Sequence, residues 1–216
     1  MVATLFSGLV DFGLDVFDYA NTEKTRASLV SRTVDAMVWL RSQAPSAPLV
    51  IVGHSLGSVI ASHAVNSMCL SEEMTSEISL VTLGSPLNYL CRVFPKIIKS
   101  PREISLAIHP NVRWVNLWRD ADLIGKHLDL EPRATVQFCV GKGGHSNYWS
   151  DGVVWRAVAF ESLGLGTYKK PLAPGTRPER SVVEAWLGTL LFAAISLLSI
   201  IGMLGFWYLF HYLVKL

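Results

Sequence analysis

The chain has 216 residues, a formal net charge of +2 and hydrophobic side chains at half of its positions. A charge this small does not favour nucleic acid as a partner. The length allows one folded core and one additional element. The mean hydropathy of +0.36 is high for a purely soluble domain, so we looked for a local source of the apolar excess.

The first forty residues predict two helices. Leu5, Leu9, Phe12 and Val16 recur with helical spacing and indicate an amphipathic helix. Acidic residues interrupt this segment and no basic region precedes it, which excludes a signal peptide. A second helix is expected to start at Asn21 or Thr22 and to run to about residue 43, shortly before a proline.

A G-x-S-x-G pentapeptide, residues 53–57, directly follows an apolar run that predicts a strand over Leu49–Val52. In this pattern a sharp strand-to-helix turn lifts the serine hydroxyl clear of the backbone, and the glycines make room for the close approach. Ser55 is therefore the candidate nucleophile. The competing interpretation is a serine that merely caps the following helix. The backbone N–H of Leu56 is expected to serve as an oxyanion-hole donor.

Three further strands are predicted over Ile78–Leu83, Arg113–Trp118 and Thr135–Val140. Short apolar runs that alternate with helical segments favour the α/β class, with a parallel sheet and crossover helices. In such a sheet the functional groups gather beyond the carboxyl ends of the strands. Ser85 follows the second strand, where we expect either a turn-forming Ser-Pro or a residue that lines the pocket.

The last two predicted strands are followed by a candidate acid and a candidate base. Asp120 and Asp122 come after the third strand, and we favour Asp122 while Asp120 remains an alternative. His145 ends a glycine-rich loop after the fourth strand, so Ser55, Asp122 and His145 stand in the order of an α/β-hydrolase triad. The other five histidines are less suitably placed, in the elbow, on a helix, in a turn, in a loop or near the C-terminus: His54, His63, His109, His127 and His211.

Neither a metal nor a cofactor is expected. Cys69, Cys91 and Cys139 are widely spaced in apolar surroundings, which predicts reduced, packed thiols. The glycine-rich run over residues 141–144 lacks the phosphate-loop pattern, and no dinucleotide fingerprint is present.

The C-terminal part predicts a membrane anchor. No charged residue occurs from Ala185 to Val214, a stretch long enough to cross a bilayer, and aromatic residues stand near both of its ends. The alternative is a buried core hairpin. We expect a domain over residues 1–165, a linker rich in proline, glycine and basic residues over 166–180, and a transmembrane helix over 181–214. Basic residues before the span place the domain of this single-pass protein on the cytoplasmic side.

The region from Leu49 to Asp151 resembles the α/β-hydrolase superfamily, especially its lipase and esterase branches. The resemblance rests on four segments, residues 50–58, 81–87, 114–124 and 145–149. It implies Ser55 as nucleophile, Asp122 as acid, His145 as base and Leu56 as oxyanion donor. It also implies an acyl-enzyme and an ester or lipid substrate.

The chain departs from that superfamily upstream of the elbow. Such hydrolases place several strands and a His-Gly loop before it, whereas the 48 residues that precede Leu49 here read as helical. A sheet that lacks those strands would leave an edge open to a partner. The alternative function is therefore a catalytically inactive, membrane-anchored interaction module, and acyl transfer by the same triad is a third. The sequence does not indicate an oligomeric state.

Overall fold

A computed structural model describes residues 13–70, 77–131 and 135–165 of the protein. The chain divides into two compact units, residues 24–179 and residues 1–23 with 180–216. In the latter unit the structure describes only residues 13–23. Residues 13–21 are helical, a stretch that overlaps the first predicted helix and extends past Val16. The predicted linker and the predicted span lie outside the described residues. None of the helices in the described ranges combines the length and the apolar character needed to span a membrane.

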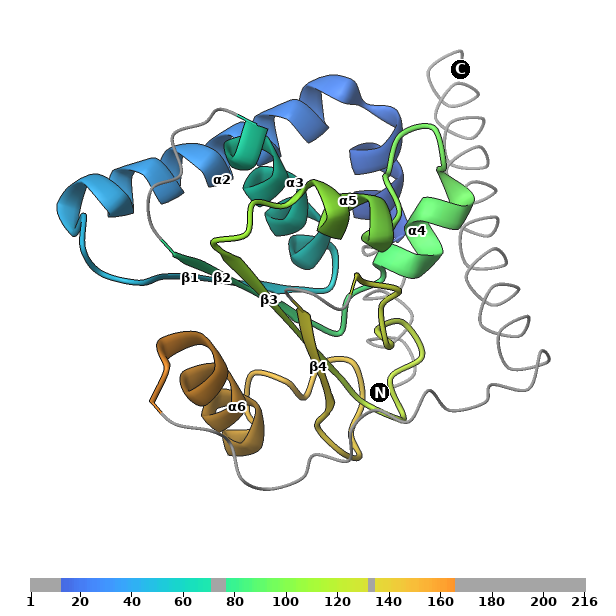
Figure 1. The fold of residues 1–216 in the computed structure, drawn as a ribbon. Helices are drawn as coiled ribbons and strands as arrows, with labels where there is room; N and C mark the ends of the chain where they lie inside the picture. The colour runs from blue at the N-terminus through green and yellow to red at the C-terminus, as the bar shows by residue number, and fades with distance from the viewer. Residues whose placement is uncertain (1–12, 71–76, 132–134, 166–216) are drawn as a thin grey trace, which may run out of the picture. The chain divides into compact units, whose positions relative to one another are not determined.

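The larger unit is built around a parallel sheet of four strands in the order β1-β2-β3-β4 (Figure 1). The strands are β1 (Leu49–His54), β2 (Ile78–Leu83), β3 (Val112–Trp118) and β4 (Thr135–Cys139). Every strand predicted from the sequence is present, with small shifts at the ends. In the observed register Gly53 pairs with Thr82, Thr82 with Asn116, and Asn116 with Gln137. The carboxyl ends of the strands therefore meet at one edge of the sheet.

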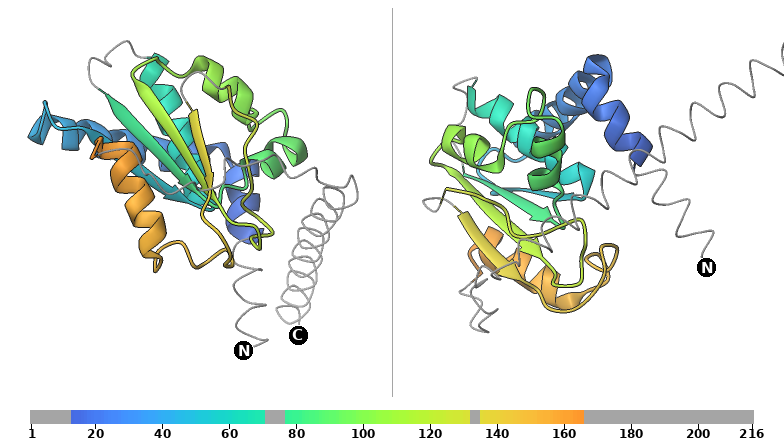
Figure 2. Two further views of the ribbon diagram at one scale, coloured as in Figure 1. Left: turned by 60° about the horizontal axis from the view of Figure 1, so that its bottom comes forward. Right: turned by 90° about the vertical axis from the view of Figure 1, so that its right-hand side faces the viewer.

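Helices cover both faces of this sheet. They are α2 (Glu23–Gln43), α3 (Leu56–Leu70), α4 (Leu87–Val93), α5 (Pro101–Ala107) and α6 (Gly152–Leu163). The views agree that α3 and α6 lie on opposite faces (Figures 1 and 2). The α2 prediction is confirmed, whereas α4, α5 and α6 were not predicted. Two of these three carry clear start signals: Ser100 and Glu103 form a capping box for α5, and Asp151 caps α6.

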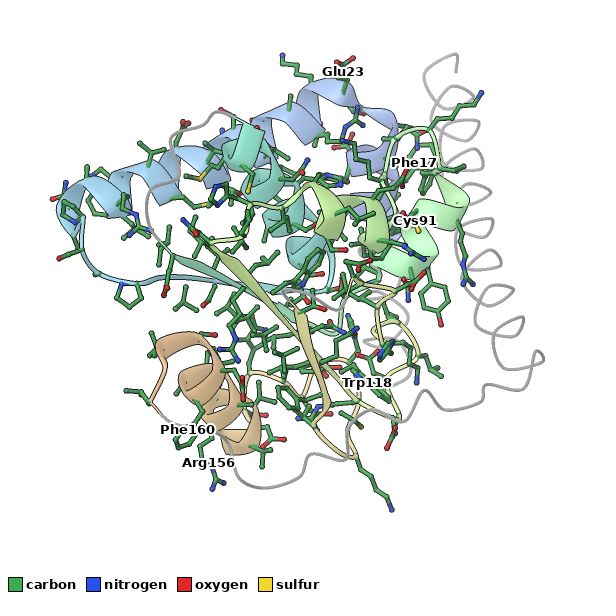
Figure 3. All side chains as sticks on the ribbon, in the orientation of Figure 1. Phe17, Glu23, Cys91, Trp118, Arg156 and Phe160 are labelled. Atoms are coloured by element: carbon green, nitrogen blue, oxygen red, sulfur yellow. The ribbon has the colours of Figure 1, made fainter. Side chains whose placement is uncertain are left out.

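The alternation of side chains along β2 and β3 divides the core into two layers. Val81, Leu83, Val115 and Leu117 belong to the layer that includes buried residues of α6. Figure 3 shows Arg156 and Phe160 on the side of α6 that points away from the sheet. The alternating residues of β2 and β3 face the other layer, and they include Leu80, Thr82, Trp114 and Asn116, all buried. The indole N–H of Trp114 donates to Thr82 (3.0 Å), and the Thr82 hydroxyl donates to Asn116 (2.9 Å). The polar side chains of Thr82, Trp114 and Asn116 are thus paired with one another inside the core.

The connection from β3 to β4 contains no helix over residues 119–131. The sequence predicts a parallel sheet with crossover helices in general, and this connection is an exception. Side-chain amides satisfy the backbone there instead. The side-chain amide of Gln137 accepts from the N–H of Leu128 and donates to its carbonyl, both at 2.9 Å. Asn116 donates to the carbonyl of Lys126, and Asn88 to that of His127. This irregular connection carries Asp122.

Candidate active site

Ser55 stands on a strained turn between β1 and α3. Its φ of 54° makes it the one non-glycine residue with positive φ among those that the structure describes. Two bonds hold the turn: the Ser55 N–H donates to the carbonyl of Leu83 (3.1 Å), and the Ser58 N–H donates to the carbonyl of Ser55 (3.0 Å). A Cβ on Gly53 would lie 2.6 Å from the backbone of residues 57 and 58, so that position requires glycine. This is the geometry of a nucleophile elbow.

The second glycine of the pentapeptide has no such requirement. A Cβ on Gly57 would meet no atom within 4 Å. The expectation that both glycines make room for the turn is therefore wrong for Gly57. The helix leaves the elbow at an angle that keeps this position clear of its neighbours.

His145 joins the serine to the carboxylate. Its Nε2 lies 2.8 Å from Oγ of Ser55, and its Nδ1 lies 3.0 Å and 2.9 Å from the two carboxylate oxygens of Asp122. The carboxylate can only accept, so Nδ1 carries a proton and Nε2 is left to accept from the serine hydroxyl. The three residues come from the ends of β1, β3 and β4, and Trp118, the last residue of β3, marks this edge in Figure 3.

Asp122 is fully buried, and every polar neighbour that bonds its carboxylate is a donor. Oδ1 accepts from the N–H groups of Ile124 and Gly125, both at 2.9 Å, and Oδ2 accepts from the hydroxyl of Tyr148 at 2.8 Å. Burial by itself raises the pKa of Asp122, but the hydrogen bond and charge of His145, followed by Gly125 and Tyr148, hold the pKa below its ordinary value. The acid is thus ionised at neutral pH.

Gly84 makes room for this carboxylate. The residue follows β2 with a φ of +55°, and a Cβ there would lie 2.8 Å from both Oδ2 of Asp122 and Cε2 of Tyr148. A Cβ on Gly125 would in turn lie 2.1 Å from the backbone of Gly84. The two loops touch backbone to backbone, which is possible only between glycines.

Ser85 forms a turn, as one of the two sequence interpretations expects, and it also bonds the elbow. Its side chain is buried and its Oγ lies 2.7 Å from Oγ of Ser58, which in turn donates to the carbonyl of Ser55 (2.5 Å). The Leu87 N–H also donates to Oγ of Ser85 (3.4 Å). A chain of buried hydroxyls therefore ties the loop after β2 to the elbow.

The histidine next to the nucleophile supports the catalytic candidate instead of competing with it. Nε2 of His54 donates to the backbone carbonyl of His145 at 2.7 Å, and the two rings lie 4.8 Å apart. Burial lowers the pKa of His54 below its ordinary value, and the hydrogen bond to the carbonyl of His145 opposes this lowering only in part. A neutral His54 thus holds the backbone of His145 in place through this hydrogen bond.

The remaining predicted residues are placed as follows. Leu56 is the first residue of α3, so its N–H has no intrahelical acceptor and is free to serve as an oxyanion donor. Asp120 is exposed and does not reach the triad; its carbonyl accepts from Lys126 (2.6 Å). His63 lies on α3, His109 lies before β3, and His127 lies in the β3–β4 connection, all away from Ser55. His211 lies outside the described residues. Cys69, Cys91 and Cys139 form no disulfide among the described residues and are partly buried. In the described ranges no group of side chains is arranged to hold a metal ion.

Sequence reasoning missed two residues beside the triad. Tyr148 bonds Asp122, and the buried Arg119 contacts the loop that carries His145. Tyr148 follows His145 by three positions, and Arg119 precedes Asp122 by three. A basic residue at the buried end of a strand is an available signal, because such charges are almost never buried unpaired.

A match to a known family agrees with this architecture. Residues 8–96 match the family model of the class 3 lipases, a stretch that includes Ser55 and ends before Asp122. No curated protein matches the chain. Among solved structures, the chain is similar to the NocB thioesterase domain in covalent complex with a fluorophosphonate nocardicin G analogue. The identity is 15%, the TM-score 0.41, and the match covers 68% of this chain and 80% of that one. The parallel sheet, the elbow and the family match together define a lipase-like α/β-hydrolase fold.

Proposed function

We propose that the protein is a serine hydrolase that cleaves carboxylic esters through an acyl-enzyme. The observation that carries the proposal is the continuous hydrogen-bonded path from Oγ of Ser55 through the ring of His145 to Asp122. A serine hydroxyl is a weak nucleophile until a base removes its proton, and this geometry supplies the base and the group that orients it.

The steps follow from the positions of these side chains. Oγ of Ser55 attacks the ester carbonyl while Nε2 of His145 takes its proton. Asp122 keeps the proton on Nδ1 and stabilises the imidazolium that forms. The Leu56 N–H donates to the developing oxyanion. His145 then protonates the leaving alcohol, and a water molecule, activated by the same imidazole, releases the acid from Ser55.

Two further parts of the proposal concern the substrate and the membrane. The match to class 3 lipases supports lipid esters as the substrate class. The uncharged stretch from Ala185 to Val214 supports a single transmembrane helix over residues 181–214 after the linker 166–180. The basic residues before it support a cytoplasmic position for the domain of residues 1–165.

Labelling with a fluorophosphonate probe tests the hydrolase proposal. The full-length protein should form a covalent adduct and hydrolyse a short-chain p-nitrophenyl ester. Ser55→Ala should abolish the adduct, and His145→Ala should lower turnover by about 10⁴-fold or more. Ser46→Ala, which removes an exposed serine before β1, is the matched control and should label like the wild type. A folded wild type that neither labels nor turns over any short-chain ester would overturn the proposal in favour of an inactive interaction module.

The membrane anchor needs its own measurement. After expression of the full chain, membranes are washed with alkaline carbonate, which strips peripheral proteins. We expect the protein to stay in the pellet. Complete release into the supernatant would contradict a membrane-spanning helix, without bearing on the chemistry of Ser55.

A further inference from the structure

The loop between β4 and α6 has to be held still for His145 to work. It contains Gly141, Gly143 and Gly144, residues that lose more conformational freedom on folding than any others. Around the glycines its internal bonds are few: the Gly144 N–H donates to Oδ1 of Asn147 (2.8 Å), and the Asn147 N–H donates to the carbonyl of Gly144 (3.2 Å). The bonds that follow His145 within the loop, from Ser150 to Asn147 and from Asp151 to Tyr148, are both long, at 3.4 Å. The position of the imidazole therefore depends on contacts from outside the loop.

His54 supplies one such contact at the carbonyl of His145, and Tyr148 reaches out of the loop to Asp122. Arg119 supplies further contacts, on both sides of the histidine. It directly follows β3, and its side chain is only 3% exposed. Nη1 donates to the carbonyl of Lys142 (2.5 Å), which lies before His145 in the chain. Nη2 donates to Oδ2 of Asp151 (2.6 Å) and to the carbonyl of Asn147 (3.4 Å), which lie after it. One guanidinium thus fastens the loop on both sides of the histidine.

The loop is packed directly against this group. A Cβ on Gly143, whose φ is +142°, would lie 2.5 Å from Nη1 of Arg119. The guanidinium carbon also lies 5.0 Å from the centre of the Tyr148 ring, and the hydroxyl of that ring bonds Asp122. Arg119 touches none of the triad side chains in these contacts, yet it contacts the neighbours of both His145 and Asp122.

Stability alone is a poor explanation for this arrangement. Removing a guanidinium from water is costly, and a buried ion pair is often no better for stability than well-packed apolar residues. Moreover, Nε of Arg119 is buried with no hydrogen-bond partner among the described residues. What the arginine offers over an apolar side chain is a rigid fork with several donors in fixed directions.

We propose that Arg119 is a positioning residue. It holds residues 142–151 so that His145 faces Ser55 and Asp122 at the same time. The catalytic part of this inference rests on the proposed function. A displacement of about 1 Å in a catalytic group can cost about 10²-fold in rate, so the loss of this clamp is expected to lower kcat.

The test compares Arg119 with Arg113, which stands at the other end of β3. Arg113 also pairs with a carboxylate, that of Glu161 on α6, but its side chain is half exposed. In the full-length protein, Arg119→Ala should lower kcat for a p-nitrophenyl ester by about 10²-fold with KM nearly unchanged. Arg113→Ala should leave kcat at the wild-type level. Millimolar guanidinium should restore part of the kcat of Arg119→Ala and none of that of Ser55→Ala, because it can re-enter the vacated site.

A second readout does not depend on activity. Amide hydrogen exchange over residues 141–151 should become faster in Arg119→Ala and stay unchanged in Arg113→Ala. If Arg119→Ala does not fold, Asp151→Asn decides, since it keeps the side-chain volume and removes the charge that holds Nη2. Wild-type kcat together with wild-type exchange in the folded variant would overturn the role of Arg119. An unreactive wild type would overturn the proposed function alone, because the exchange result would still show whether Arg119 holds the loop.

Discussion

The phenolic oxygen of Tyr148 lies 2.8 Å from Oδ2 of Asp122, the same carboxylate oxygen that faces Nδ1 of His145 at 2.9 Å. The tyrosine and the histidine come from one loop and converge on one acid from the end of another strand. Burial, and then the nearby carboxylate, raise the pKa of Tyr148, so its hydroxyl is protonated and acts as a donor at neutral pH. This second donor fixes the carboxylate plane independently of the histidine.

Replacing Tyr148 with phenylalanine should therefore destabilise the fold. A buried hydrogen bond to a charged group contributes about 1.5–3 kcal/mol to stability, and the remaining donors on Asp122 should keep the loss near the lower value. Chemical denaturation of the full chain in detergent at neutral pH measures it. Ser150→Ala is the control, because the hydroxyl it removes is exposed and makes only one long bond. Equal stability of Tyr148→Phe and wild type would contradict a structural role for the tyrosine hydroxyl.

Gly84 and Gly57 should respond in opposite ways to alanine. Gly84→Ala places a Cβ 2.8 Å from the acid at a positive φ, which costs about 1–2 kcal/mol in backbone strain alone and also displaces Asp122. Gly57→Ala adds a Cβ in open space, so its stability should stay within about 0.5 kcal/mol of wild type or rise. Unfolding free energies and fluorophosphonate labelling rates of both variants check this. The expectation fails if Gly57→Ala is the more damaging change.

The stability of the protein should fall as the pH drops below about 6.5, because of His63 on α3. Burial, followed by the positive charges of Arg26 and Lys99, lowers the pKa of His63 from 6.5 to about 4. Between these values the unfolded chain binds a proton that the folded protein does not, so stability is full above 6.5 and is lost toward 4. The loss is at most about 3 kcal/mol.

Denaturation curves across this pH range test the role of His63. His63→Gln should flatten the dependence, and Arg26→Gln should flatten it in part, because one of the charges that oppose protonation is removed. A His63→Gln variant with the same pH slope as wild type would show that other groups cause the loss.

The local pattern of the chain predicts much of the sheet. Apolar runs of strand length, bounded by polar or glycine-rich segments, locate β1 to β4. The central strands β2 and β3 are buried, which demands nearly continuous hydrophobic residues, and the edge strands β1 and β4 are partly buried. Helices α4 and α5 are short, and α6 follows directly on the histidine loop, so their apolar periodicity is too brief to stand out. The β3–β4 connection lacks a helix because amides distant in sequence, those of Asn88 and Gln137, bond its backbone, and local patterns do not report such contacts.

For the site, the sequence alone determined which residues stand at strand ends: Ser55 in its elbow, Asp120 and Asp122 after β3, and His145 after β4. Those positions depend on local spacing, which can be read along the chain. Only the tertiary structure decided which aspartate meets the histidine, that Ser85 bonds Ser58, and that Tyr148 and Arg119 surround the acid and its loop. These contacts join segments that are up to about ninety residues apart, from Ser55 to His145. Hydrogen bonds depend on distances of a few tenths of an ångström, which only the packed loops define.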